Sequence, residues 1–228
     1  MDSVARQFRE VSLGKLTTQL EALRAERAAV PATRATEIGA ESIRLLKARG
    51  MGSDAIRVGS DAPDFSLPNQ NGKIVRLREL LKDGPVVLSF YRGSWCPFCN
   101  LQLRALQDAL PQILELGATL VAVSPELPDG SLTWMDRHSL TFSVLSDLGN
   151  TVAKQYGLVF RLGDEHVQAL KERGQDLTAI NGEDGANELP IPATFVINTA
   201  GVVEVTCVDP DHTYRVDPDH IIRYLESL

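Results

Sequence analysis

The 228-residue sequence has few cysteines, no long apolar run and no excess of positive charge. Three cysteines are too few to staple a secreted domain of this size, so a C-x-x-C pair among them indicates redox chemistry or a metal in a reducing compartment. No stretch reaches the ~18 apolar residues of a membrane helix. Arg6, Arg9 and Glu10 stand where a secretory signal would be hydrophobic, so we expect a cytoplasmic protein with no membrane contact.

The charge balance argues against nucleic acid as a partner. The 23 basic and 30 acidic residues give a formal net charge of -7, which repels phosphate backbones and anionic lipid surfaces. Hydrophobic residues make up 43% and charged residues 23%, as in ordinary soluble proteins. The length suits one domain with a small extension.

Two amphipathic patterns, over residues 4–23 and 33–49, predict an N-terminal helical extension that covers residues 1–54. From residue 55 to 228, strand and helix patterns alternate, which predicts an α/β domain with a mostly parallel, covered sheet. The expected strands are 65–67, 74–77, 86–91, 119–123, 142–145, 158–161, 194–197 and 202–205. The expected helices are 103–113, 132–138, 150–156, 165–173 and 218–225. Residues 162–189 are polar and indicate an insertion or lid.

The strongest chemical signal is Cys96-Pro97-Phe98-Cys99, where a buried strand gives way to a helix. Unpaired N-H groups and the dipole at a helix N-terminus favour an anion, so this position lowers a thiol pKa and supplies thiolate. Pro97 fits the first helical position, where a backbone donor is not needed. Two residues between the thiols allow one sulfur to attack and the other to resolve the product as a disulfide.

Other residue types near the pair allow further interpretations. Arg92 could stabilise a thiolate or polarise a peroxide oxygen, although a surface ion pair would also account for it. Trp95 could shield the site or simply pack. A structural zinc site would need two more ligands, for which the candidates are Cys207, His138, His166, His212 and His220, and their spacing is unconvincing. Residues 209–215 form either a binding edge or, as we favour, a turn with surface ion pairs. Cys207 reads as a buried, inert thiol.

The segment Tyr91 to Asn100 resembles the active site of thioredoxin-fold proteins, with strand, aromatic residue, Trp, C-x-x-C and helix in order. Ile191-Pro192-Ala193-Thr194-Phe195 resembles the segment of that fold whose proline is cis and faces the cysteine pair. The resemblance therefore implies a cis bond before Pro192. It also implies a supporting or substrate-binding role for Trp95, Pro97, Pro192 and Thr194.

Several motifs in order resemble the peroxiredoxin branch of this fold, the AhpC/TSA family, over residues 56–228: Pro63-Asp64-Phe65, Val123-Ser124-Pro125, Phe142 to Asp147 and Ala153 to Leu158. The resemblance implies a thioredoxin-like fold, with a central mixed β-sheet flanked by helices. It implies reduction of hydrogen peroxide or alkyl hydroperoxides by Cys96 and Cys99, with no metal or organic cofactor. A dithiol such as thioredoxin would be the reductant, and such proteins often form homodimers.

The attacking sulfur stays open. In the P-x-x-x-T-x-x-C loop of peroxiredoxins, Cys99 would take the peroxidatic position, with Arg92 in place of the proline and Cys96 in place of the threonine. The arginine that the family places just before Thr194 appears here as Pro192. Thioredoxin logic instead makes Cys96 the more exposed attacker, which we favour. Two other functions stay open: a thioredoxin-like protein-disulfide reductase, and a non-catalytic redox-sensing module.

Overall fold

The computed structural model describes residues 14–128 and 139–228 and centres on a five-stranded sheet with the strand order β5-β4-β3-β8-β9. β3 pairs in parallel with β4, and β4 with β5, whereas β8 and β9 add antiparallel pairs at the other side. The strands are β3 (Val86–Phe90), β4 (Thr119–Ser124), β5 (Ser143–Ser146), β8 (Ala193–Ile197) and β9 (Val203–Val208). The sheet is therefore mixed, as predicted, because the final hairpin reverses direction.

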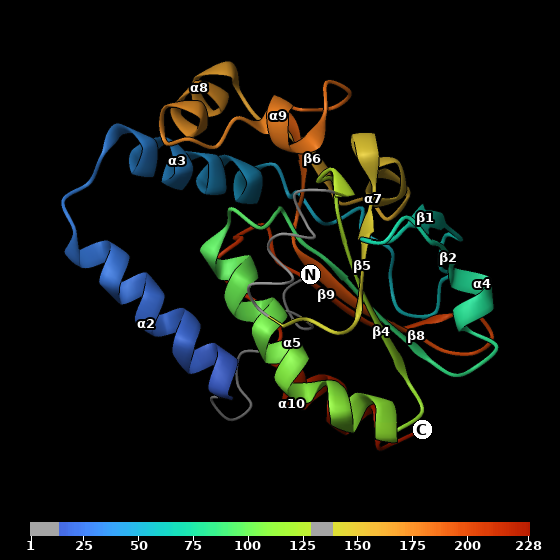
Figure 1. Cartoon of the computed structure of the whole chain (residues 1–228). Helices are drawn as coiled ribbons and strands as arrows, with labels where there is room; N and C mark the ends of the chain where they lie inside the picture. The colour runs from blue at the N-terminus through green and yellow to red at the C-terminus, as the bar shows by residue number, and fades with distance from the viewer. Residues whose placement is uncertain (1–13, 129–138) are drawn as a thin grey trace.

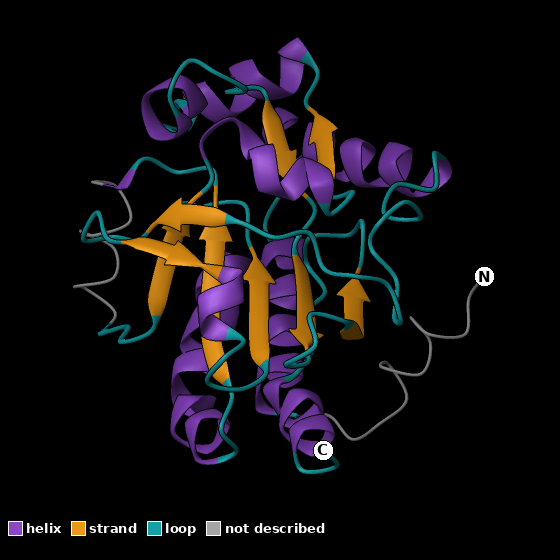
Figure 2. Ribbon diagram, turned by 90° about the vertical axis from the view of Figure 1, so that its right-hand side faces the viewer, coloured by secondary structure: helices purple, strands orange, loops and turns teal. Residues whose placement is uncertain are grey.

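Both faces of the sheet are covered (Figures 1 and 2). On one face lie α5 (Pro97–Glu115), α10 (Pro218–Leu225) and α2 (Lys15–Ala29). The other face carries the β1–β2 hairpin and short helices: β1 (Ser66–Pro68), β2 (Ile74–Arg76), α4 (Leu77–Leu80), η1 (Leu148–Asn150) and α7 (Thr151–Gln155). Every residue of β3 is buried, which explains why its sequence is a continuous run rather than an alternating one.

The predicted strand at 158–161 forms, but it leaves the central sheet. β6 (Val159–Arg161) pairs only with β7 (Glu188–Pro190), and between them run α8 (Asp164–Glu172) and α9 (Leu177–Asn181). These elements lie together at one end of the molecule (Figure 1). The polar insertion has an apolar centre of its own, formed by Leu162, Leu170, Leu177 and Leu189.

The described part of the N-terminal extension, from residue 14 on, contains the two helices α2 and α3 (Arg34–Ala48), and α3 packs on α8 (Figure 1). Residues 4–13 of the first predicted helix, and the predicted helix at 132–138, lie outside the described residues. The boundary at residue 54 stays a prediction. Among residues 14–128 and 139–228, no helix is both long and apolar enough to cross a membrane.

One buried carboxylate caps two helices from opposite ends of the chain. Asp217, which is 4% exposed, caps α10 by accepting from the Asp219 backbone N-H at 3.4 Å. It also accepts from the backbone N-H of Thr17 at 3.1 Å, in the first turn of α2, where Gly14 offers no side-chain cap. A Cβ at Gly14 would lie only 2.1 Å from the Asp217 carboxylate, so glycine permits this close approach.

Asp217→Ala is expected to destabilise the fold by about 2 kcal/mol, because it removes a cap from two helices at once and leaves partly buried hydrogen bonds unmade. Urea unfolding should show a lower midpoint at an unchanged slope. Asp219→Ala, an exposed change on the same helix, is the matched control and should cost no more than about 0.5 kcal/mol. Equal losses in the two variants would contradict the double cap.

Candidate active site

The cysteine pair lies where β3 gives way to α5, as the sequence predicts. Past the end of β3, the Tyr91 backbone N-H still donates to the carbonyl of Val123 at 3.0 Å. Cys96 is the N-cap residue of α5, and Pro97 is its first helical residue. Gly93 turns the chain at φ 148°, and a Cβ there would lie 2.4 Å from the Trp95 indole nitrogen. The backbone thus aims the N-terminus of α5 at the first sulfur.

Both sulfurs are free thiols and both are buried, Cys96 at 2% exposure and Cys99 at 0%. Cys96 is the more exposed of the two, as expected, but only slightly, because the pair lies in the apolar cluster of Tyr91 and Phe98, with Trp95 packed against it. A hydrogen bond from Cys99, together with the charges of Arg92 and Arg215, lowers the pKa of Cys96 to about 5 despite burial. Burial raises the pKa of Cys99 well above its usual value. One thiolate and one thiol therefore coexist near neutral pH.

Arg92 is a buried cation beside the pair and not a surface residue. It is 4% exposed, and its guanidinium carbon lies 4.8 Å from the centre of the Trp95 ring. Burial lowers the pKa of Arg92, whereas the charges of both cysteines raise it. Within the described part of the chain, neither Arg92 Nε nor Trp95 Nε1 has a hydrogen-bond acceptor. The site therefore holds positive charge and unused donors next to Cys96.

Arg215 is the functional residue that the sequence reasoning missed. Its Nη2 donates to Cys99 Sγ at 3.3 Å, and its Nε donates to Gln102 Oε1 at 2.6 Å. The signal was weak, because residues 209–215 were interpreted as a turn with surface ion pairs. Gln102 gave a better hint, since it is a polar side chain one turn after Cys99 on the apolar face of α5. Arg215 supplies a guanidinium in a site where Pro192 replaces the family's arginine.

Thr194 joins the same network, and Pro192 does not. Thr194 is 1% exposed on β8, and its hydroxyl accepts from Gln102 Nε2 at 3.2 Å. The bond before Pro192 is trans, so the predicted cis bond is wrong. The chain runs from β7 into β8 with the Ile191 N-H donating to the carbonyl of Leu158 at 2.8 Å, a path that a trans peptide continues.

A buried acid lies near Cys96, and two histidines from other elements lie near Arg92. Glu126, 1% exposed at the end of β4, accepts from Ser94 through both the backbone N-H at 2.9 Å and the hydroxyl at 2.7 Å. Burial raises the pKa of Glu126. Burial and the charge of Arg92 lower the pKa of His166 to about 4, and the same two causes lower that of His212 well below its usual range. Both imidazoles are therefore neutral at pH 7.

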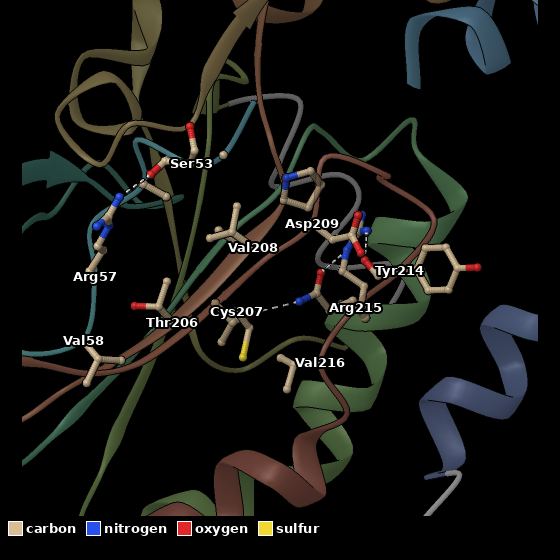
Figure 3. Close-up of a pocket in the computed structure, with 16 residues that line it drawn as sticks. Ser53, Arg57, Val58, Thr206, Cys207, Val208, Asp209, Tyr214, Arg215 and Val216 are labelled. Carbon is tan, nitrogen blue, oxygen red and sulfur yellow. Dashed lines mark hydrogen bonds between the residues drawn. The ribbon is translucent and has the colours of Figure 1, made fainter. Parts of the chain in front are cut away.

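A cavity of about 480 Å³ lies beside Arg215 (Figure 3). Its wall combines the end of β9 with residues between 52 and 58, with Asp209 and with residues 214–216, and it includes Gln102, Thr194 and Pro192. Cys207 lies in this wall, and burial raises its pKa to about 12. The third thiol therefore stays protonated, which agrees with its interpretation as inert.

The described residues offer no group of three or more His, Cys, Asp and Glu side chains that could hold a metal. His138 lies outside them. Within residues 14–128 and 139–228, nothing supplies the further ligands that the zinc alternative needs. The arrangement instead supports thiol chemistry, because a buried thiolate, a resolving thiol and two arginines meet at one helix N-terminus.

These features define a thiol oxidoreductase with a thioredoxin-like fold, and comparisons with known proteins narrow the class. A model of the AhpC/TSA family matches residues 58–206. The peroxiredoxin bcp of Coxiella burnetii is 31% identical over 149 residues, which cover 65% of this chain and 86% of that protein. The bcp peroxiredoxin of Haemophilus influenzae is 32% identical over 175 residues, which cover 76% of this chain and 98% of that protein. The crystal structure of peroxidoxin BcpB from Mycobacterium tuberculosis matches with a TM-score of 0.62 and 26% identity. The match covers 76% of this chain and 98% of that one.

The family match spans most of the chain, and two relatives above 30% identity are covered over most of their length, so the chain belongs to the AhpC/TSA family. It is an oxidoreductase of the peroxiredoxin kind, a thiol peroxidase. This agrees with the resemblance in the sequence. The matched segment excludes both the N-terminal helices and Arg215.

Proposed function

We propose that the chain reduces hydroperoxides through a dithiol-disulfide cycle of Cys96 and Cys99, with Cys96 as the attacking sulfur. The observation that carries the proposal is the asymmetry of the pair. Cys96 caps α5 and its pKa is lowered to about 5, whereas Cys99 lies inside the first turn with a raised pKa. At neutral pH the nucleophilic thiolate therefore resides on Cys96.

In the first step the Cys96 thiolate attacks the terminal oxygen of the hydroperoxide and the O-O bond breaks. The sulfur is oxidised to a sulfenic acid, and the departing alkoxide takes up a proton to leave as an alcohol, or as water from hydrogen peroxide. Arg92 lies beside Cys96 with Nε unused among the described residues, so it is placed to stabilise the negative charge that develops on oxygen. Trp95 forms the flat apolar support under Arg92.

In the second step the Cys99 sulfur attacks the sulfenic acid, a disulfide forms, and water leaves. Arg215 donates to Cys99 Sγ, so it stabilises the thiolate that this step requires. An external dithiol such as thioredoxin then reduces the disulfide by thiol-disulfide exchange, and its own two thiols are oxidised to a disulfide. In that exchange Cys99 is the leaving thiolate, and the same contact with Arg215 favours its departure.

A protein-disulfide reductase is less well supported as the main activity. Its attacking sulfur must meet a disulfide on another protein's surface while the pair is in the dithiol state, in which Cys96 is 2% exposed. Thioredoxin, in contrast, reacts with the pair only after the disulfide has formed. A small hydroperoxide needs far less access. The cis-proline that favoured this alternative is also absent, since the bond before Pro192 is trans. We propose the cytoplasm as the compartment, because a redox-active thiol pair needs a reducing environment to return to the dithiol state. We also propose a homodimer, which size-exclusion chromatography would test.

The proposed function is tested by peroxide-dependent NADPH consumption with thioredoxin and thioredoxin reductase. We expect turnover with hydrogen peroxide and tert-butyl hydroperoxide, and insulin reduction no faster than in a blank. Cys207→Ser is the matched control and should keep full activity, because the Cys207 thiol stays protonated. Insulin reduction without peroxide turnover would instead assign the pair to disulfide exchange. Loss of both activities would leave the redox-sensing module.

A further inference from the structure

The N-terminal extension contacts the stretch of chain that carries Arg215. This stretch, residues 209–217, contains neither helix nor strand and is here named the Arg215 segment. Arg215 itself donates to the backbone carbonyls of His212 and Tyr214, so the local path of the segment fixes the guanidinium. Anything that holds the segment in place therefore holds Arg215 against Cys99.

Helix α3 forms an ion pair with the segment four residues before Arg215. Lys47 Nζ lies 2.8 Å from Asp211 Oδ2, and the Asp211 side chain is only 12% exposed. The second oxygen of Asp211 accepts from the Thr213 backbone N-H at 3.2 Å and from its hydroxyl at 2.8 Å. Hydrogen bonds from Lys47 and Thr213 outweigh burial and lower the pKa of Asp211. The ion pair is thus tied into the turn that leads to Arg215.

Helix α2 contacts the segment both before and after Arg215. Arg24 Nη1 donates to the carbonyl of Thr213 at 2.8 Å, and its guanidinium carbon lies 4.3 Å from the Tyr214 ring centre. Beyond Arg215, Asp217 caps the first turn of α2. The segment is therefore fastened on both sides of Arg215 by the extension, which lies outside the matched family segment.

A third set of contacts reaches the cysteine loop itself. Arg27 of α2 lies 5.3 Å from the ring centre of Phe98, the residue before Cys99, and the His212 ring meets Phe98 edge-on at 5.8 Å. We infer that the N-terminal helices complete the active site, with Arg24 and Lys47 as positioning residues that hold Arg215 on the cysteine pair. The inference rests on the proposed role of that pair, and it gives the extension a function beyond covering the core.

The test is the pH titration of thiolate ultraviolet absorbance in the reduced protein, in a Cys207→Ser background so that only the pair contributes. Charged and titratable groups that face the pair or its arginines come from several elements, namely Tyr91, Arg92, Glu126, His166, His212 and Arg215. None of these is changed in the Lys47 and Arg24 variants. Lys47→Met and Arg24→Met should each raise the apparent pKa of the cysteine pair by about half a unit. At pH values below that pKa, each variant should then hold about threefold less thiolate.

Matched controls separate positioning from charge and from general packing. Arg44→Met removes a positive charge from α3 at a residue whose ion pair is with Glu41 on the same helix, and Lys15→Met removes the α2 contact with Asp108 on α5. Neither should shift the titration by more than about a tenth of a unit. Lys47→Arg should restore the original midpoint. Circular dichroism and urea midpoints verify that each variant is folded.

A double-mutant cycle decides whether Lys47 acts through Arg215. In an Arg215→Met background, Lys47→Met should add no further shift. A full additional shift, equal shifts in the Arg44 and Lys15 controls, or unchanged titrations in both positioning variants would each overturn the inference. The titration requires no peroxide, so absence of peroxidase turnover would defeat the proposed function while leaving this result to be judged by itself.

Discussion

Cys96→Ser is expected to abolish the rapid reaction with peroxide, whereas Cys99→Ser keeps it and stops at the sulfenic acid. The reason is that the thiolate of the pair resides on Cys96, at the N-cap of α5, and Cys99 is the protonated partner. Loss of the attacking sulfur should slow oxidation by roughly three orders of magnitude, to the level of an ordinary thiol. Loss of the resolving sulfur should prevent the intramolecular disulfide.

Stopped-flow fluorescence measures the first of these effects. Trp95 packs against the cluster that contains both cysteines, so its emission should report oxidation. Trp134 lies outside the described residues, and a Trp134→Phe background assigns the signal to Trp95. Dimedone trapping followed by mass spectrometry then locates the sulfenic acid, which we expect on Cys96 in the Cys99→Ser protein. Cys207→Ser serves as the control with unchanged kinetics.

The reverse pattern would have an equally clear meaning. If Cys99→Ser abolished the rapid phase and Cys96 carried no dimedone, Cys99 would be the attacking sulfur. This corresponds to the peroxiredoxin alignment that the sequence left open. Arg215 would then stabilise the nucleophile directly, since it already contacts Cys99 Sγ at 3.3 Å.

Local patterns predicted most of the fold. The buried run at residues 86–91, the C-x-x-C at a strand-to-helix junction and the last helix at 218–225 all formed as expected, because apolar periodicity and turn residues act over short distances. The strand that β6 pairs with could not be predicted from local patterns. Strand pairing depends on partners far along the chain, and β6 finds β7 instead of the central sheet.

The candidate site was predicted in part for the same reason. Cys96, Cys99, Pro97 and Arg92 lie within a few residues of one another, so spacing alone revealed them. Arg215 is separated from Cys99 by 116 positions and comes from a segment without regular structure. Only the tertiary fold places its guanidinium on the sulfur. The resemblance to thioredoxin-fold active sites also misled on Pro192, whose trans bond follows from its extended path between two strands.

Arg215→Met is expected to raise the apparent pKa of the cysteine pair by about one to two units. Arg215 donates to Cys99 Sγ, and Cys99 in turn donates a hydrogen bond to Cys96, so the two sulfurs titrate as a coupled pair. A hydrogen bond from a charged donor contributes about 1.5–3 kcal/mol, and one pKa unit corresponds to about 1.36 kcal/mol. The sign follows from the charge, because Arg215 favours the thiolate form of both sulfurs and its loss favours the thiol. At pH 5, where the Cys96 thiolate is half formed, the thiolate fraction should fall about five- to fiftyfold.

The pH profile of peroxide oxidation distinguishes this electrostatic role from a structural one. A purely electrostatic loss on Cys96 disappears above about pH 8, where the thiolate forms in either protein. Disulfide formation, in contrast, should stay slow in Arg215→Met at all pH values, because the Cys99 thiolate loses its only charged donor among the described contacts. Arg215→Lys keeps the positive charge but lacks the planar guanidinium that donates to Gln102 and Cys99 at once. This variant should restore the pKa of the pair more fully than the rate of disulfide formation. An unchanged titration in Arg215→Met would show that the Cys99 hydrogen bond and Arg92 set the thiolate without Arg215, and the role given to Arg215 would be wrong.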